Sequence, residues 1–489
     1  MATNMRAHEA GVVHADGYGA APQWLPYPTD VMELLPELWA QTVTRDAAGH
    51  LTVGGVAVTD LATEFGTAAY VLDEADFRAR AGAFRDAFAE AFTPVSGGAD
   101  VYYAGKAFLC TEVARWIADE GLGLDTCSLG EMTVARRGGM DPAKVGLHGN
   151  NKSDAELRFA LEWGIGRIIV DSLEEIDRLV VIARELGVTA RVMVRVTVGV
   201  EAHTHEFIAT AHEDQKFGLS LAGGRAKEAI DAILAAPDAL ELLGLHSHIG
   251  SQIFDVSGFE ISARRLIDLH AQVADEHGVQ MPELDLGGGY GIAYTSEHDP
   301  LTPARLASGL ASVVGAEFAA RNATRPVPLD VPRVSIEPGR AIVGPAMFTL
   351  YEVGTVKDVE VDHNASRTYV SVDGGMSDNI RTALYGADYS CTLASRTSTA
   401  GPRLTRVVGK HCESGDIVVM DEYLPADLTR GDLIAVPGTG AYCRSMASQY
   451  NHVPRPPVIA VRDGRARVIV RRESVDDILA LDVVEGEHP

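Results

Sequence analysis

The sequence predicts an α/β fold, a (β/α)8 barrel followed by an antiparallel β domain. Between residues 73 and 345, short apolar runs alternate with helix-like stretches, and the apolar runs number eight. Such alternation requires parallel strands, and eight repeats favour a closed barrel over an open doubly wound sheet, which remains the alternative. After Pro345 the pattern changes to alternating runs with Gly and Asp turns between them, which is typical of antiparallel strands.

The chain divides into four predicted segments. Residues 1–35 are rich in Gly, Ala, Pro and His without periodicity, and we expect a loosely ordered extension. Residues 36–72 have strand-like texture and are expected to join the β domain, residues 346–489. The barrel, residues 73–345, opens with a helix for which Asp73 is a plausible N-cap. The helix carries phenylalanines at mostly helical spacing, namely Phe77, Phe84, Phe88 and Phe92.

The eight predicted barrel strands are short and apolar, and helix-like stretches such as "SLEEIDRLVVIARELG" lie between them. They are "VYYAG" (101–105), "GLGLDTC" (121–127), "KVGLHG" (144–149), "RIIVDS" (167–172), "ARVMVRV" (190–196), "LLGLHSH" (242–248), "ELDLGG" (283–288) and "RVSIEP" (333–338). In the second domain, the strand-like runs include "RTYVSVDGG", "DIVVMDEY", "DLIAVPG" and "RARVIVRRE".

Composition excludes several classes of protein. The chain has 489 residues, 46% of them hydrophobic and 22% charged, as is usual for globular proteins of more than one domain. Its formal charge of −26 argues against nucleic acid or an anionic membrane as the main partner. Five scattered cysteines lack metal-ligand spacing, so we expect no metal site and no disulfide framework. We also find no signal peptide and no membrane-spanning run, and therefore expect a cytoplasmic protein.

Polar and glycine-rich segments follow the predicted strands, where the functional groups of such barrels stand. Lys106 follows the first strand, Gly287–Gly289 the seventh and Glu337 the eighth. Alone, the lysine would be a strand-end residue that reaches solvent, and the glycines would form a tight turn. Their place favours a phosphate cradle, although neither a dinucleotide fingerprint nor a P-loop is present. A lysine, a phosphate cradle and an acid on one face are typical of a pyridoxal 5'-phosphate (PLP) enzyme.

Several motifs carry a family resemblance. In order along the chain they are "YYAGKAF", "SHIGSQ", "LDLGGGYG", "EPGR", "LYGADY", "HCESGD" and "GAYCRSMASQYN". From about residue 50 to the C-terminus, the chain resembles the diaminopimelate decarboxylases, which are fold-type III, alanine-racemase-like PLP enzymes. The resemblance implies a PLP barrel, a C-terminal β domain and a homodimer with shared active sites. The implied reaction converts meso-2,6-diaminopimelate to L-lysine and CO2, the last step of lysine biosynthesis.

The resemblance also implies roles for cofactor-binding residues. Lys106 resembles the Schiff-base lysine, His248 the histidine that stacks on the cofactor ring, and Glu337 the acid that faces the pyridine nitrogen. His246 is expected to be only a structural hydrogen-bonding residue. The implied phosphate-binding set and further cofactor contacts are Gly250, Ser251, Gly287, Gly288, Gly289, Gly339, Arg340 and Tyr442.

Other positions resemble substrate-binding and catalytic residues. Arg340, Arg381 and Tyr385 would hold the distal carboxylate of the substrate, a task that suits a forked guanidinium. Glu413 would bind the distal ammonium. Cys412, inserted by a partner subunit, would donate a proton to the reacting carbon after CO2 leaves. Tyr442 would contact cofactor or substrate.

Three alternatives stay open at this point. A decarboxylase of ornithine, arginine or a diaminopimelate analogue could use the same fold, although Arg381 together with Glu413 weighs against a basic substrate. A racemase would need two opposed proton-transfer groups, and only Cys412 is identified. A non-catalytic PLP carrier is the third alternative, which the presence of a proton donor disfavours.

Overall fold

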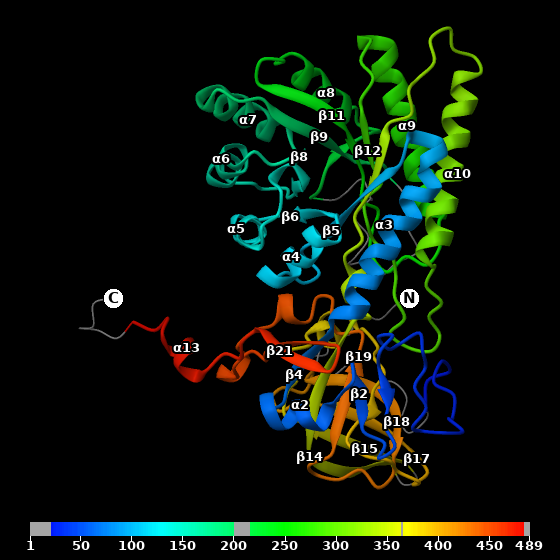
Figure 1. The fold of residues 1–489 in the computed structure, drawn as a ribbon, viewed down its shortest axis with the longest axis vertical. Coiled ribbons are helices and arrows are strands. Elements are labelled where there is room, and N and C mark those ends of the chain that lie inside the picture. Colours follow the sequence, from blue (N-terminus) through cyan, green and yellow to red (C-terminus); the bar gives the residue numbers. More distant parts are fainter. Residues whose placement is uncertain (1–20, 200–215, 363–364, 484–489) are drawn as a thin grey trace. The chain divides into compact units, whose positions relative to one another are not determined.

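The computed structural model describes residues 21–199, 216–362 and 365–483 (Figure 1). The described chain forms two compact units. The barrel unit comprises Arg78–Gly291 and Asp299–Ile342, and the β unit comprises the described parts of Met1–Phe77, Ile292–His298 and Val343–Pro489. Residues 1–20 of the predicted extension lie outside the described residues, and the domain limits given above stay predictions.

The barrel unit contains a closed ring of eight parallel strands. They are β5 (Ala99–Ala104), β6 (Gly123–Thr126), β7 (Val145–Leu147), β8 (Arg167–Val170), β9 (Ala190–Thr197), β11 (Leu240–His246), β12 (Glu283–Asp285) and β13 (Arg333–Ile336). Each pairs with its neighbours in the ring, β13 pairs with β5, and β8 pairs with β9. The short strand β10 (Leu219–Ser220) adds to β9. The predicted barrel is confirmed, and the alternative of an open sheet is wrong.

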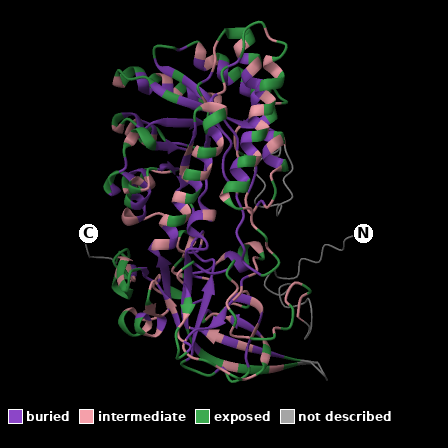
Figure 2. Cartoon of the chain, turned by 45° about the vertical axis from the view of Figure 1, so that its right-hand side comes forward, coloured by how far each residue is buried: buried purple, intermediate pink, exposed green. Residues whose placement is uncertain are grey.

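Helices follow the strands and cover the barrel on the outside (Figure 1). They are α3 (Glu74–Ser96), α4 (Thr111–Asp119), α5 (Leu129–Gly138), α6 (Asp154–Trp163), α7 (Leu173–Leu186), α8 (Arg225–Leu234), α9 (Ser257–His277) and α10 (Pro303–Asn322). Because both faces of the strands are covered, every residue of β6, β7 and β8 is buried (Figure 2).

Local sequence signals explain where the helices begin and end. The predicted N-cap is confirmed at Asp73, whose Oδ1 accepts the N–H of Asp76 at 3.0 Å. Helix α6 begins with a capping box between Ser153 and Glu156 and ends at Gly164, which adopts the left-handed conformation that terminates helices.

The β unit is built mainly from antiparallel strands. Its central strand β14 (Met347–Asp362) pairs antiparallel with β4 (Ala69–Asp73), β15 (Ala365–Val372) and β19 (Leu433–Pro437). The remaining elements are β1 (Thr44–Arg45), β2 (Leu51–Val53), β3 (Val56–Ala57), α2 (Val58–Phe65), α12 (Arg381–Tyr385), β16 (Thr392–Leu393), β17 (Pro402–Val408), β18 (Ile417–Pro425), β20 (Val458–Arg462), β21 (Arg465–Val470) and α13 (Val475–Leu479). Two pairings, β15 with β17 and β20 with β4, are parallel. The predicted antiparallel domain is therefore confirmed with these two exceptions.

The core of the β unit joins segments that lie far apart in the sequence. Strand β4 sits between β14 and β20, so Val71 packs with Phe348 and Ile459 in one buried cluster. Trp39 joins this cluster and meets the Phe348 ring edge-on, with the ring centroids 5.9 Å apart. This packing buries one face of the sheet in the β unit.

Candidate active site

A pocket of about 380 Å³ opens in the barrel unit at the carboxyl ends of its strands. Six strands supply lining residues at or near their carboxyl ends, as expected of a barrel whose functional face is at that end. The lining residues are Ala104, Gly105, Lys106, Asp125, Thr126, Cys127, Glu131, His148, Gly149, Asn150, Asn151, Arg195, Phe217, His246, His248 and Glu337.

Lys106 lines this pocket on a tight turn after β5. The N–H of Gly105 donates to the carbonyl of Asp125 at 3.0 Å, and the N–H of Ala107 donates to the carbonyl of Ala104 at 3.1 Å. A Cβ at position 105 would lie 2.8 Å from the Asp125 carbonyl, so glycine permits this close approach. The Lys106 side chain remains exposed at the pocket and presents a primary amine there.

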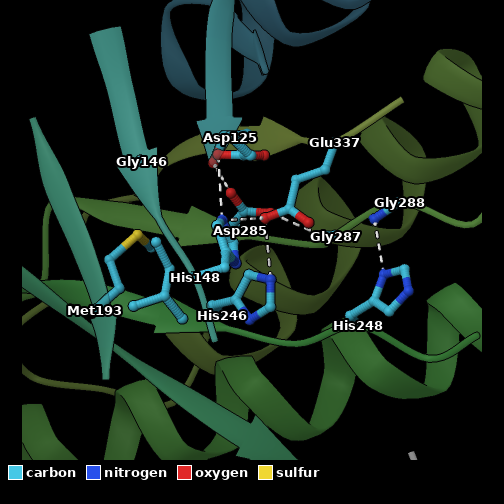
Figure 3. A network of polar contacts seen from close by, with 12 residues as sticks. Asp125, Gly146, His148, Met193, His246, His248, Asp285, Gly287, Gly288 and Glu337 are labelled. Atoms are coloured by element: carbon cyan, nitrogen blue, oxygen red, sulfur yellow. Dashed lines mark hydrogen bonds and ion pairs between the residues drawn. The ribbon is translucent and has the colours of Figure 1, made fainter. Parts of the chain in front are cut away.

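Glu337 is the centre of a buried polar network in the same pocket. Its Oε1 lies 3.0 Å from Nε2 of His246 and 3.4 Å from Nε2 of His148. The same nitrogen of His148 lies 3.1 Å from Oδ1 of Asp125. Figure 3 shows these four side chains turned toward one another, although no well-aligned hydrogen bond joins their buried atoms.

The two carboxyl groups of this network have opposite electrostatic environments. Burial raises the pKa of Asp125, and repulsion from Glu337 raises it further. Burial acts in the same sense on Glu337, but attraction from His246 and His148 outweighs it and holds the pKa of Glu337 well below its usual value. Glu337 is therefore the more readily ionised of the two carboxyl groups.

His248 stands beside the glycine loop that follows β12. Its Nδ1 accepts the N–H of Gly288 at 3.2 Å, as Figure 3 shows. Burial lowers the pKa of His248 well below its usual value, and the charges of Lys106 and Arg195 add to this effect. His248 is therefore a neutral, flat ring at the pocket.

The loops after β11, β12 and β13 form a glycine-lined cradle. A Cβ at Gly288 would lie 2.2 Å from the Glu337 carbonyl, and one at Gly289 would lie 2.3 Å from the Gly250 carbonyl. The N–H of Ile253 donates to the carbonyl of Gly289 at 2.9 Å, which holds the first two loops side by side. Only glycine allows this approach, which favours a ligand bound by main-chain groups.

Arg340 connects the loop after β13 to the loop after β11. It is the first residue of α11 (Arg340–Val343), and its Nη2 donates to Oγ of Ser251 at 3.0 Å. Gly339 precedes it, where a Cβ would lie 2.8 Å from the Ala104 carbonyl. An amine, an ionised acid, a neutral ring and a cationic cradle are the groups that PLP requires, so the residues of the barrel unit fit this cofactor.

In the β unit, Arg381 and Tyr385 are the first and last residues of α12, so they lie on one helical face. The guanidinium of Arg381 is buried, lies 4.6 Å from the centre of the Tyr294 ring and donates to the hydroxyl of Tyr389. Burial acts to lower the pKa of Arg381, but the neighbouring Tyr294 and Tyr389 raise it overall. Arg381 is therefore a permanent, rigidly held cation.

The "HCESGD" segment forms a tight loop of the β unit. Asp416 accepts the main-chain N–H groups of His411 at 2.7 Å and of Met376 at 2.6 Å. The ring of His411 contacts Oγ of Ser377 through Nε2 at 2.8 Å. These contacts anchor the loop on both sides of Cys412, which is exposed, and Glu413, which is half-buried.

Tyr442 lies on another loop of the β unit, in a conformation that non-glycine residues rarely adopt. Its φ is 65°, in the left-handed region. Such strain is retained mainly where the surrounding structure enforces it, and it is concentrated at functional sites. The geometry thus agrees with a functional role for this loop.

The structure places the predicted residues in two groups. Lys106, His248 and Glu337 line one pocket, and the glycines, Ser251 and Arg340 form the cradle. Arg381, Tyr385, Cys412, Glu413 and Tyr442 belong to the β unit. Sequence reasoning assigned no role to His148 or Arg195, which also line the pocket. His148 directly follows β7, so its place at a strand end was the available signal.

Comparison with known proteins identifies the family. The model of the family "Pyridoxal-dependent decarboxylase, pyridoxal binding domain" matches residues 75–344. Diaminopimelate decarboxylase of Mycobacterium leprae is 53% identical over 98% of this chain and 100% of its own length. The chain belongs to the diaminopimelate decarboxylase family. The enzyme of Mycobacterium tuberculosis is 54% identical over 93% of this chain and 99% of its own.

A solved structure agrees with this membership. Diaminopimelate decarboxylase from M. jannaschii, in complex with L-lysine, superposes with a TM-score of 0.83 at 30% identity and covers 91% of this chain and 98% of its own. The chain is accordingly a PLP-dependent decarboxylase, a carbon–carbon lyase, as the resemblance implied. Within residues 21–199, 216–362 and 365–483, no helix combines the length and apolarity needed to cross a membrane.

Proposed function

We propose that this member of the diaminopimelate decarboxylase family converts meso-2,6-diaminopimelate to L-lysine and CO2, as the last step of lysine biosynthesis. The relatives named above support the reaction, and the chemistry of the two groups of residues supports the substrate. When bound, PLP supplies an electron sink that stabilises the charge left on the α-carbon as CO2 departs. Side chains of this protein bind the cofactor and the substrate and transfer the proton.

The barrel unit is proposed to hold the cofactor. Lys106 supplies the amine that binds the cofactor aldehyde, and the neutral ring of His248 covers one face of the pyridine. Glu337, as an ionised carboxylate, keeps a proton on the pyridine nitrogen. The proposed cradle for the phosphate consists of Gly250, Ser251, Gly287, Gly288, Gly289, Gly339 and Arg340, with Tyr442 as a further contact.

Arg381 is the observation that carries the substrate assignment. Its buried guanidinium is held between aromatic rings, which leaves its charge able to attract a carboxylate. We expect Arg381, with Tyr385 and Arg340, to bind the distal carboxylate of diaminopimelate, and Glu413 to bind the distal ammonium. Ornithine and arginine have no distal carboxylate, so a buried cation would repel them.

The active site is proposed to be shared between the two subunits of a homodimer. Cys412 is exposed at the tip of an anchored loop, as a residue that reaches a partner would be. Its thiol would then protonate the α-carbon after CO2 has left. The five cysteines are free thiols, which agrees with a reducing compartment, and we propose that the enzyme works in the cytoplasm.

The first test is an assay of CO2 release by the PLP-loaded protein with meso-diaminopimelate, ornithine and arginine side by side. We expect release from diaminopimelate alone, with lysine formed in equal amount. Release only from ornithine or arginine would overturn the role of Arg381 but keep the reaction class. A bound cofactor without CO2 release from any of the three would favour another substrate or a carrier.

A second test concerns the lysine. Lys106→Ala should remove both the absorbance of the covalently bound cofactor and turnover, because Lys106 is the only lysine among the described residues that line the pocket. Lys144→Ala, a change of an exposed lysine in the same unit, is the matched control and should retain both. Full absorbance and turnover in Lys106→Ala would contradict the assignment.

A further inference from the structure

One oxygen of Glu337 faces two histidines, His148 and His246, to which the sequence assigns no part in catalysis or cofactor binding. Oε1 lies 3.0 Å from Nε2 of His246 and 3.4 Å from Nε2 of His148, and all three side chains are at least half-buried. The two imidazole rings meet edge-on, with centroids 5.2 Å apart (Figure 3). A single carboxylate oxygen is therefore bracketed by two ring nitrogens.

These contacts determine where the imidazole protons reside. A nitrogen lone pair opposite a carboxylate oxygen would be repelled, so both Nε2 atoms must carry hydrogen. His148 faces a second carboxylate through the same atom, Oδ1 of Asp125 at 3.1 Å, which strengthens the requirement. Two N–H groups thus face Oε1 of Glu337 at ion-pair distance, although neither is aligned as a hydrogen bond.

The other neighbours of Asp125 and Glu337 make Glu337 the more readily ionised of these two carboxyl groups. On its far side, Asp125 faces Nη2 of Arg167 at 3.6 Å, but this guanidinium lies closer to Asp285, at 2.7 Å. Asp125 therefore competes poorly for the charge of Arg167 and shares His148 with Glu337, whereas Glu337 also faces His246 at 3.0 Å. The directions of the two pKa shifts given above agree with this geometry.

We propose that His148 and His246 are positioning residues that together hold Glu337 ionised and oriented, so that it keeps the pyridine nitrogen of PLP protonated. His246 thereby gains a role beyond the structural one expected from the sequence. The inference rests on the proposed function of Glu337. It concerns the protonation of the cofactor, which can be observed separately from turnover.

The experiment compares leucine and glutamine at each position in PLP-loaded protein. Leucine removes the donor, while the side-chain amide of glutamine can place an N–H near the position of Nε2. The matched control is His270 on α9, a buried histidine that packs on Phe318 outside the pocket. The readouts are the 15N NMR shift of the pyridine nitrogen in protein loaded with 15N-labelled PLP, and the kcat and KM of decarboxylation.

We expect the 15N shift of H148L and H246L to move toward that of an unprotonated pyridine, because a less stabilised carboxylate takes the shared proton. Their kcat should fall about 10- to 100-fold, as when partners that orient a catalytic group are removed, while KM stays within about threefold. H148Q and H246Q should restore much of the 15N shift, and H270L should leave it unchanged.

An unchanged 15N shift in both leucine variants would overturn the proposal, whatever their activity. If leucine prevents folding, H148N and H246N take its place, because the shorter side chain withdraws the donor from the Nε2 position. If the unmodified protein binds PLP but releases no CO2, the proposed function fails, and the 15N comparison still decides the role of the histidines.

Discussion

At the scale of single residues, Arg381 shows how this chain stabilises a buried cation with aromatic neighbours. Its guanidinium lies 4.6 Å from the ring centre of Tyr294 and 5.5 Å from that of Tyr389, whose hydroxyl accepts a hydrogen bond from Nη1. The hydroxyl of Tyr389 also lies 3.6 Å from Sγ of Cys443. Tyr389 therefore fixes the direction of the guanidinium as well as covering it.

Tyr389→Phe should weaken substrate binding while sparing the chemical step. Losing a hydrogen bond to a charged group costs about 1.5–3 kcal/mol, so we expect the KM for diaminopimelate to rise roughly 10- to 100-fold with kcat within about twofold. Steady-state kinetics measure both constants. Tyr369→Phe on β15 is the control and should change neither; an equal fall in kcat and kcat/KM would place Tyr389 in the chemistry instead.

At the scale of elements, the sequence predicts strands better than contacts between them. Parallel strands buried on both faces are short apolar runs, so all eight could be located, and Lys106 and Glu337 could be placed at strand ends. The contact of His148 with Glu337 joins β7 to β13, and no local pattern encodes it. It depends on the closure and register of the barrel, which also explains why His246 was assigned only a structural role.

Arg167 illustrates such a contact inside the barrel. It starts β8, is fully buried, and its Nη2 pairs with Asp285 of β12 at 2.7 Å. Arg167→Met should remove roughly 3–5 kcal/mol of stability, because Asp285 would be left as a buried charge without its partner. Thermal unfolding measures the change. Arg158→Met, which breaks an exposed pair with Glu185, should cost less than about 1 kcal/mol, and an equal loss in both variants would contradict the argument.

The loop before α12 should make the stability of the β unit depend on pH. Asp378 is buried, and burial raises its pKa to about 7 despite the hydrogen bonds that it accepts from Tyr351 and the N–H of Gly375. A carboxyl whose pKa is raised in the folded state is favoured there when protonated. The free energy of unfolding therefore falls as the pH rises from the pKa of Asp378 in the unfolded chain, about 4, to its pKa in the folded protein, about 7. Above this pH the contribution of Asp378 is constant.

Asp378→Asn removes this titration. Relative to the wild type, the variant should gain about 2–3 kcal/mol in stability between pH 5 and pH 8, because only the wild type must ionise a buried group over this range. Melting temperatures of both proteins at the two pH values test the difference. Asp60→Asn, an exposed change on α2, should show no such trend, and parallel pH profiles for Asp378→Asn and wild type would refute the assigned cause.

At the scale of the whole molecule, the proposed catalytic groups are divided between the two compact units. Lys106 and Glu337 belong to the barrel unit, and Cys412 belongs to the β unit. If Cys412 serves the barrel of a partner, each site of the homodimer combines one barrel unit with the loop of the other subunit. Two inactive variants with defects in different units can then complement each other, whereas two variants with defects in the same unit cannot.

Mixing Lys106→Ala with Cys412→Ala should therefore restore activity. Random reassortment makes about half of the dimers mixed, and one of the two sites in each mixed dimer is intact, so roughly a quarter of wild-type activity should return. Lys106→Ala mixed with Glu337→Gln is the control; both defects affect barrel units, so every site keeps one of them and activity stays low. Activity measured after the subunits have exchanged distinguishes the two mixtures. If exchange is demonstrated but the mixture of Lys106→Ala and Cys412→Ala recovers no activity, Cys412 acts within its own subunit or not at all.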